Sequence, residues 1–108
     1  MIKKPTTKPK VGSFITILDW MVKKLNLHSD ELIVYAIIYS FSQDGQSCFK
    51  GSIKYLSYWT GKTKPTIIKI LKLLLEKKLI IKTKIQYTKK NVNRYYCEYR
   101  AVLPLMDV

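Results

Sequence analysis

The chain has 108 residues, of which 47% are hydrophobic, and a formal net charge of +13 at pH 7. This length fits one domain, and this hydrophobic content excludes a disordered basic tail because it can supply a core. So large an excess of positive charge favours a polyanionic partner such as nucleic acid. A basic membrane-surface helix fits less well, because the lysines spread over several expected elements.

Other broad classes are disfavoured by the same sequence. No apolar run is long enough to cross a membrane, and the basic start is not followed by the apolar run of a signal peptide. Cys48 and Cys97 have no Cys or His neighbours at metal-binding spacing, so we expect reduced thiols in a cytoplasmic protein, with a disulfide as the alternative. The few acids and the single histidine, His28, form no dyad, triad or metal cluster, so we expect no enzyme activity, cofactor or metal.

The chain is expected to divide into an arm, one domain and a short tail. Residues 1–12 hold two prolines and four lysines, which predicts a flexible basic arm. This arm is either a solvated tail or a segment that reaches along a DNA backbone or into a minor groove. Residues 13–103 are expected to form a single domain, and residues 104–108 a tail.

The first helix is expected within residues 13–27, after a short extended piece over residues 13–17. Asp19 is the expected N-cap. Lys23 and Lys24 would lie near the helix C-terminus, where the helix dipole favours positive charge. The expected buried face consists of Trp20, Met21, Leu25 and Leu27.

The second helix is expected over residues 28–41, with Ser29 as its N-cap. Asp30 and Glu31 would occupy the first turn, where the dipole favours negative charge. Because this segment is apolar on almost all sides, we place it at the centre of the fold. Residues 42–50 read as a loop, with Phe49 turned back under the following helices.

Residues 51–80 show the pattern of a helix-turn-helix unit, with a short helix, a glycine turn at Gly61 and a second helix within residues 62–77. The short helix would begin at Ser52 as its cap and end near Trp59. Thr63 is the second N-cap candidate, and Pro65 falls in the first turn, where its missing N–H costs little. Helical spacing predicts core positions at Ile67, Ile70, Leu71 and Leu74 and leaves Ile68, Leu73 and Leu75 to cover a hairpin or a partner subunit.

Two alternating segments, residues 79–87 and 94–102, flank a polar turn over residues 88–93 and predict a β-hairpin. In the first segment, the alternation predicts a half-buried face of Ile81, Thr83, Ile85 and Tyr87 against Lys82, Lys84 and Gln86. The expected fold class is therefore mainly α with a C-terminal β-hairpin: a winged helix-turn-helix of three to four helices plus the wing.

A set of motifs spread over nearly all of the chain after the arm is typical of one family. The residues of these motifs are Phe14, Trp20-Met21, Leu25-Asn26-Leu27, Glu31 to Tyr39, Phe49 to Ser52, Tyr55-Leu56, Thr60-Gly61, Thr63 to Ile67, Leu71, Leu74, Leu79-Ile80 and Asn93-Arg94-Tyr95. On these residues, the chain resembles the short winged-helix domains of bacterial and phage replication-initiation and replisome-organiser proteins. This resemblance implies a role in replicating a plasmid, phage or mobile element. The family usually has glycine where this chain has Lys78, and a left-handed lysine costs on the order of 1 kcal/mol.

The helix-turn-helix unit and the wing are the expected DNA-binding surface, because Glu76 is the only acid between Lys50 and Arg94. The alternative is that the lysines merely solvate the surface. Arginine is scarce, so we expect phosphate contacts to dominate and sequence preference to be modest. The expected contacts are Lys62, Thr63, Lys64 and Thr66 on phosphates, Pro65, Lys69 and Lys72 in the major groove, and Lys82, Lys84, Lys89, Lys90, Asn91 and Arg94 of the wing along the backbone.

Three other functions compete with a replication initiator that binds double-stranded DNA. A transcriptional regulator would share its fold. A protein-interaction module could form homodimers or recruit replication proteins, with Tyr39, Tyr58, Trp59 or the hairpin tyrosines as anchors. RNA binding is less favoured, because we expect no exposed aromatic pair on a sheet.

Overall fold

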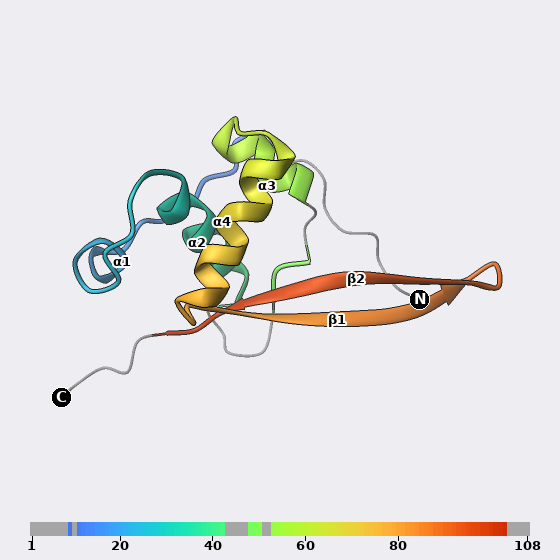
Figure 1. Ribbon diagram of the computed structural model, residues 1–108. Coiled ribbons are helices and arrows are strands. Elements are labelled where there is room, and N and C mark those ends of the chain that lie inside the picture. Colours follow the sequence, from blue (N-terminus) through green and yellow to red (C-terminus); the bar gives the residue numbers. More distant parts are fainter. Residues whose placement is uncertain (1–8, 10, 43–47, 51–52, 104–108) are drawn as a thin grey trace.

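The computed structural model describes residues 9, 11–42, 48–50 and 53–103. Within these residues the fold is a winged helix-turn-helix, as predicted (Figure 1). The predictions for most of the N-terminal arm, the Ser52 cap, the middle of the loop after the second helix and the tail lie outside the described residues. The elements are α1 (Asp19–Lys23), α2 (Ser29–Ser42), α3 (Ile53–Thr60), α4 (Lys64–Glu76), β1 (Ile80–Lys89) and β2 (Val92–Ala101).

The first helix, α1, is shorter than the sequence predicted. Its N-cap is Leu18 rather than Asp19, which is instead the first helical residue. The helix ends at Lys23, since Asn26 has a left-handed φ of 57° and the N–H of Leu27 donates to the carbonyl of Met21. Met21 and Leu27 are nevertheless fully buried, so the turn still delivers the expected apolar residues to the core.

The second helix, α2, runs through the centre of the molecule, as expected for a segment without a polar face (Figure 1). Five consecutive residues from Val34 to Ile38 are buried. Ser29 is the first residue of α2 rather than the residue before it. Burial raises the pKa of Tyr35 to about 12, and its hydroxyl donates to the carbonyl of Val102 at 2.9 Å. A protonated Tyr35 therefore fastens the end of the hairpin to α2.

The helix-turn-helix unit consists of α3 and α4, joined by a turn at Gly61. Gly61 has a φ of 72°, which glycine adopts without strain. Thr63 is the N-cap of α4 and Pro65 lies in its first turn, both as predicted. The four predicted core residues of this helix, Ile67, Ile70, Leu71 and Leu74, are all buried.

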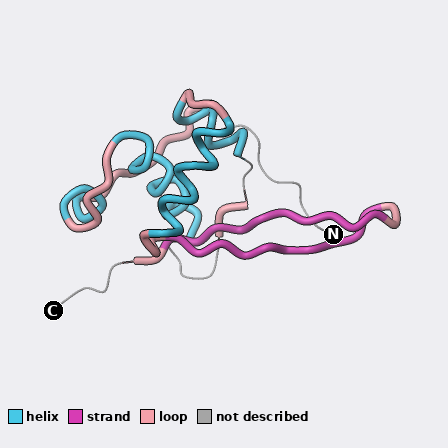
Figure 2. The backbone as a smooth tube through the Cα atoms, viewed as in Figure 1, coloured by secondary structure: helices cyan, strands magenta, loops and turns pink. Residues whose placement is uncertain are grey.

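The hairpin is longer than predicted, because its turn contains only Lys90 and Asn91. Both residues have positive φ, as a two-residue turn between twisted strands requires. The pairing runs without interruption from Ile80 opposite Ala101 to Lys89 opposite Val92. Figure 2 shows the result, a hairpin that extends well beyond the helices and ends in this turn.

The base of the hairpin is anchored in the core by contacts that connect distant parts of the chain. Phe49 is fully buried, as expected, and its backbone pairs with Tyr99 through two hydrogen bonds of 2.7 and 2.9 Å. The hydroxyl of Ser42 accepts from the N–H of Ala101 at 3.1 Å. The base is thus fixed to α2 and to the segment before α3, whereas most of the distal half of the hairpin is exposed.

Candidate nucleic-acid interface

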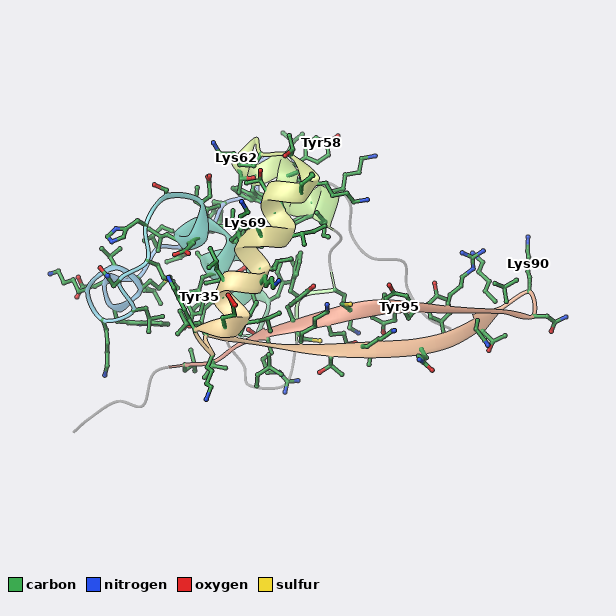
Figure 3. All side chains as sticks on the ribbon, viewed as in Figure 1. Tyr35, Tyr58, Lys62, Lys69, Lys90 and Tyr95 are labelled. Carbon is green, nitrogen blue, oxygen red and sulfur yellow. The ribbon has the colours of Figure 1, made fainter. Side chains whose placement is uncertain are left out.

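The outer face of α4 carries the residues that the sequence assigned to DNA. Because Ile67, Ile70, Leu71 and Leu74 point into the core at helical spacing, the positions between them are left in solvent. The exposed positions also include Ile68, Leu73 and Glu76; the predicted DNA contacts among them, hereafter the outer face of α4, are Lys64, Pro65, Thr66, Lys69 and Lys72. Figure 3 shows Lys69 along this helix. The helix is therefore not covered by another described segment on its proposed reading side.

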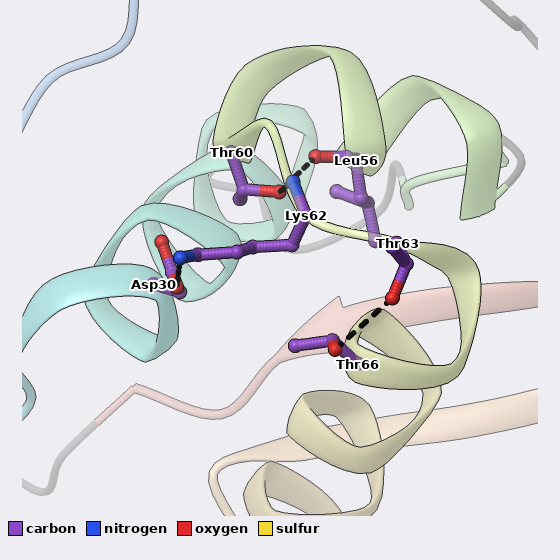
Figure 4. A network of polar contacts seen from close by, with 6 residues as sticks. All are labelled: Asp30, Leu56, Thr60, Lys62, Thr63 and Thr66. Carbon is purple, nitrogen blue, oxygen red and sulfur yellow. Dashed lines mark hydrogen bonds and ion pairs between the residues drawn. The ribbon is translucent and has the colours of Figure 1, made fainter.

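The start of α4 presents two exposed hydroxyl groups, because Thr63 occupies the N-cap position without a side-chain hydrogen bond to the helix. The Thr63 hydroxyl lies 3.2 Å from that of Thr66 instead, and both residues are exposed (Figure 4). The positive end of a helix dipole and exposed hydroxyls suit phosphate contact.

Lys62 has a nearer partner than DNA. Its ammonium lies 3.7 Å from a carboxylate oxygen of Asp30 in the first turn of α2 (Figure 4). Its backbone N–H donates to the hydroxyl of Thr60, which in turn donates to the carbonyl of Leu56. The loop before α4 is therefore held toward α2, and the Lys62 charge is partly neutralised.

Only some of the predicted wing residues share a face of the hairpin. Lys82 and Lys84 pair across the hairpin with Tyr99 and Cys97, and side chains of paired residues point to the same side of a sheet. Tyr99 is buried against the helices, so Lys82 and Lys84 project from the side of the hairpin that faces α4, hereafter its inner face.

This arrangement corrects the predicted burial of β1. Ile81 is 52% exposed, and Thr83 is also exposed. The register turns the opposite set of side chains, including the buried Ile80, toward the helices. Ile85 and Tyr87 are half-buried as predicted, so the prediction is wrong only for Ile81 and Thr83, where the opposite face of the strand packs on the core at the base of the hairpin.

The remaining wing residues lie farther out. Lys90 and Asn91 form the tip of the hairpin, which Figure 3 places far from α3 and α4. Lys89 and Arg94 lie on the face of the hairpin opposite Lys84. Side chains alternate along a strand, so Lys89, five residues after Lys84, points the other way, as do Tyr87 and its pairing partner Arg94. The structure therefore brings together the lysines of α4 and those on the inner face of the hairpin, while Lys89 and Arg94 point away from them.

A groove separates α4 from the hairpin and has a volume of about 540 Å³. Lys72 of α4 and Lys82 of β1 line it from opposite sides, together with Lys50 from the segment before α3. The sequence counted Lys50 among the basic residues but did not place it in the site, because only the pairing of Phe49 with Tyr99 brings it there. We call the groove and its lining the α4–hairpin groove.

Tyr95 is the other residue that the sequence missed. It is 60% exposed, and the Lys84 ammonium lies 4.1 Å from the centre of its ring. Tyr87 and Tyr96 also form a ring pair on the hairpin, with centroids 6.0 Å apart. Tyr87 and Tyr96 are half-buried and lie on the face opposite Tyr95, so Tyr95 is the one exposed aromatic residue of the hairpin, and the prediction of no exposed aromatic pair on the sheet holds.

Both cysteines are free thiols, as expected. Burial raises the pKa of the Cys48 thiol, and a hydrogen bond to Glu98 raises it further. Cys97 packs against the core and lines the α4–hairpin groove. Among the described residues, no helix is both long and apolar enough to span a membrane.

These elements define a winged helix-turn-helix protein with a basic helix α4 and a basic hairpin. The chain matches the family model for a helix-turn-helix domain over residues 25–80, which is more than half of its length, and it belongs to this family. The match begins before α2 and ends with the first residue of β1, so it covers the helix-turn-helix unit and not the wing. No curated protein and no solved structure matches the chain.

Proposed function

We propose that the protein binds double-stranded DNA, with the outer face of α4 in the major groove and the inner face of the hairpin along the adjacent backbone. The observation that carries this proposal is a set of exposed lysines on two facing elements. Lys64, Lys69 and Lys72 lie on α4, and Lys82 and Lys84 lie on β1. None of them forms an ion pair with a described acid. Such a set self-repels unless a polyanion neutralises it.

Phosphate contacts dominate this interface, because its charged groups are lysines. Lysine is a point charge that suits phosphate, whereas arginine is the usual reader of guanine. Arg94 points away from the α4 lysines, which further limits base readout. We therefore propose modest sequence preference, with α4 positioned mainly by charge.

A salt titration of affinity for a duplex tests the proposal. Release of counterions gives a slope of log K against log salt of about −0.9 per phosphate contact, so five lysines predict a slope steeper than about −3. Lys64→Ala or Lys69→Ala should each weaken binding and flatten the slope by about one unit. A shallower slope in the unmodified protein, or unchanged binding in both variants, would remove α4 from the interface.

We further propose that this DNA binding serves replication initiation of a plasmid, phage or mobile element. The resemblance of the helical segments and the wing to replication-initiation domains supports this role, and the family match supports the helix-turn-helix part. A transcriptional regulator is the alternative with the same fold. Sequencing of the DNA fragments that the protein retains from its source genome separates the two, because an initiator enriches an origin and a regulator enriches promoters.

A further inference from the structure

The α4–hairpin groove differs chemically from the lysine surface around it. Its walls include Ile68 and Leu75 of α4, Ile53 of α3, and Tyr95 and Cys97 of β2. Ile68 is 49% exposed although it lies on a helix that packs against the core. Phosphates make no use of such a wall, so DNA contact alone does not account for it. A groove of this volume, with apolar walls and a few charged groups at its rim, is typical of a binding site for another molecule.

Three of the segments around the groove each contribute a lysine to its rim. Lys72 stands on α4, Lys82 on β1 and Lys50 on the segment before α3. Lys50 shares its charge with Glu98 at 3.7 Å, whereas Lys72 and Lys82 have no described acidic partner. An occupant of the groove must therefore present apolar side chains to the walls and negative charge to the rim.

We propose that the groove binds an acidic amphipathic helical segment of another protein. Leucine-like side chains at i, i+4 and i+7 of that helix would pack on Ile68 and Leu75, and its flanking carboxylates would meet Lys72 and Lys82. A second copy of this chain is disfavoured as the occupant, because its net charge of +13 repels the same rim.

Occupation of the groove excludes DNA from part of its surface. Lys72 and Lys82 belong both to the rim and to the DNA-facing set, so an acidic helix and a phosphate backbone compete for the same charges. This consequence rests on the proposed DNA binding, whereas binding of the acidic helix does not. The partner would thus control access of DNA to α4.

The test uses a labelled synthetic helix of 15 residues with leucines on one face and glutamates on both flanks, measured by fluorescence anisotropy with the full chain. A peptide of identical composition, with its leucines distributed around the helix, is the control. The expected result is at least 10-fold tighter binding of the amphipathic peptide, because only this peptide offers one apolar stripe to the groove.

Two matched variants locate the binding site. Ile68→Ser changes an exposed apolar residue of α4 inside the groove, and Leu73→Ser changes one, 38% exposed, that does not line it. Ile68→Ser should lower the affinity for the amphipathic peptide about 10-fold, and Leu73→Ser should leave this affinity within 2-fold of that of the unmodified protein. Circular dichroism melts of both variants establish that they remain folded.

Three results would overturn the proposal. Equal binding of the two peptides shows that charge alone is recognised, and equal loss in the two variants places the peptide elsewhere. Binding of an oligothymidylate that is sensitive to Ile68→Ser, without binding of the amphipathic peptide, assigns the groove to a single strand stacked on Tyr95. A duplex titration in parallel keeps the two proposals separate, since loss of duplex binding leaves the peptide result unchanged.

Discussion

The lysines on the two flanks of α4 have different neighbours. On the flank that faces α2, Lys62 and Lys77 lie 3.7 and 3.0 Å from carboxylate oxygens of Asp30 and Glu31. On the outer face and the hairpin side, Lys69 and Lys72 have no such neighbour among the described residues. Lys62 precedes α4 and Lys77 follows it, so the first turn of α2 holds residues from both ends of the helix.

This difference shows that a count of lysines does not identify an interface. Asp30 and Glu31 sit in the first turn of α2, where the helix dipole favours them, and that local role explains their presence. The fold gives them a second role, because it brings the ends of α4 against the same turn. The unpaired lysines are therefore the ones available to a polyanion.

The largest expected effect on DNA affinity comes from removing the two unpaired lysines Lys69 and Lys72. Lys69→Ala with Lys72→Ala should weaken duplex binding about 10- to 100-fold at 0.1 M salt and flatten the salt slope by about two units, because two phosphate contacts are lost. Lys62→Ala with Lys77→Ala removes the same net charge from the α2 flank. Its effect should stay below about one slope unit, since those charges already have partners.

Anisotropy titrations of both double variants at several salt concentrations measure this contrast. Equal losses would mean that DNA senses only total charge and that the ion pairs with α2 do not matter. A larger loss in the Lys62 and Lys77 variant would place DNA on the opposite flank of α4.

The next prediction separates the charge of a lysine from its backbone conformation. Lys78 has a left-handed φ of 61°, which lets the N–H of Leu79 donate to the carbonyl of Leu74 after the end of α4. Lys78→Gly should therefore raise the free energy of unfolding by about 1 kcal/mol, because glycine adopts this conformation without steric cost. This outcome would confirm the cost that the family resemblance predicted for a lysine at this position.

Lys77→Gly is the control, since Lys77 lies one residue earlier with a right-handed φ of −76°. There, glycine should lower stability, because it gains no conformational relief and loses the ion pair with Glu31. Urea unfolding of both variants provides the comparison. If Lys78→Gly is no more stable than the unmodified protein, the left-handed position carries no strain.

The smallest expected effect comes from releasing a paired lysine. Asp30→Asn should free Lys62 and tighten duplex binding about 2- to 5-fold, with a salt slope steeper by up to about one unit. Asp19→Asn is a matched control, because Asp19 also lies in the first turn of a helix and also pairs with a lysine, Lys23, at 3.2 Å.

The control pair lies on α1, away from α4, so Asp19→Asn should leave affinity within about 1.5-fold by the same counterion count. Competition binding in one assay measures both variants against the unmodified protein. Equal tightening would show that net charge alone sets affinity. No change in either variant would show that Lys62 does not reach DNA when released.

Much of the fold could be predicted from local patterns. The apolar centre of α2, the Gly61 turn, the Thr63 cap and the core face of α4 each follow from spacing within a few residues, and all were confirmed. The end of α1 was wrong, because the left-handed Asn26 and the hydrogen bond from Leu27 to Met21 close that helix early. The two-residue hairpin turn was also missed, since Lys90 and Asn91 lack the glycine that usually marks it.

The candidate site was harder to predict, because its membership depends on contacts between distant residues. Lys50 joins the groove through the pairing of Phe49 with Tyr99, and Lys62 is held near Asp30 by the packing of α4 on α2. Neither contact leaves a local pattern in the sequence. The same holds for the inner face of β1, which is chosen by where the strand leaves the core.

By itself, the sequence determined which segments are helices and strands, the class of fold and the excess of positive charge, because these depend on short-range spacing and composition. Only the tertiary structure decided which lysines face acids, which face of the hairpin turns toward α4, and that a groove with apolar walls lies between them. These features arise from long-range packing, in which residues far apart in the chain share one surface.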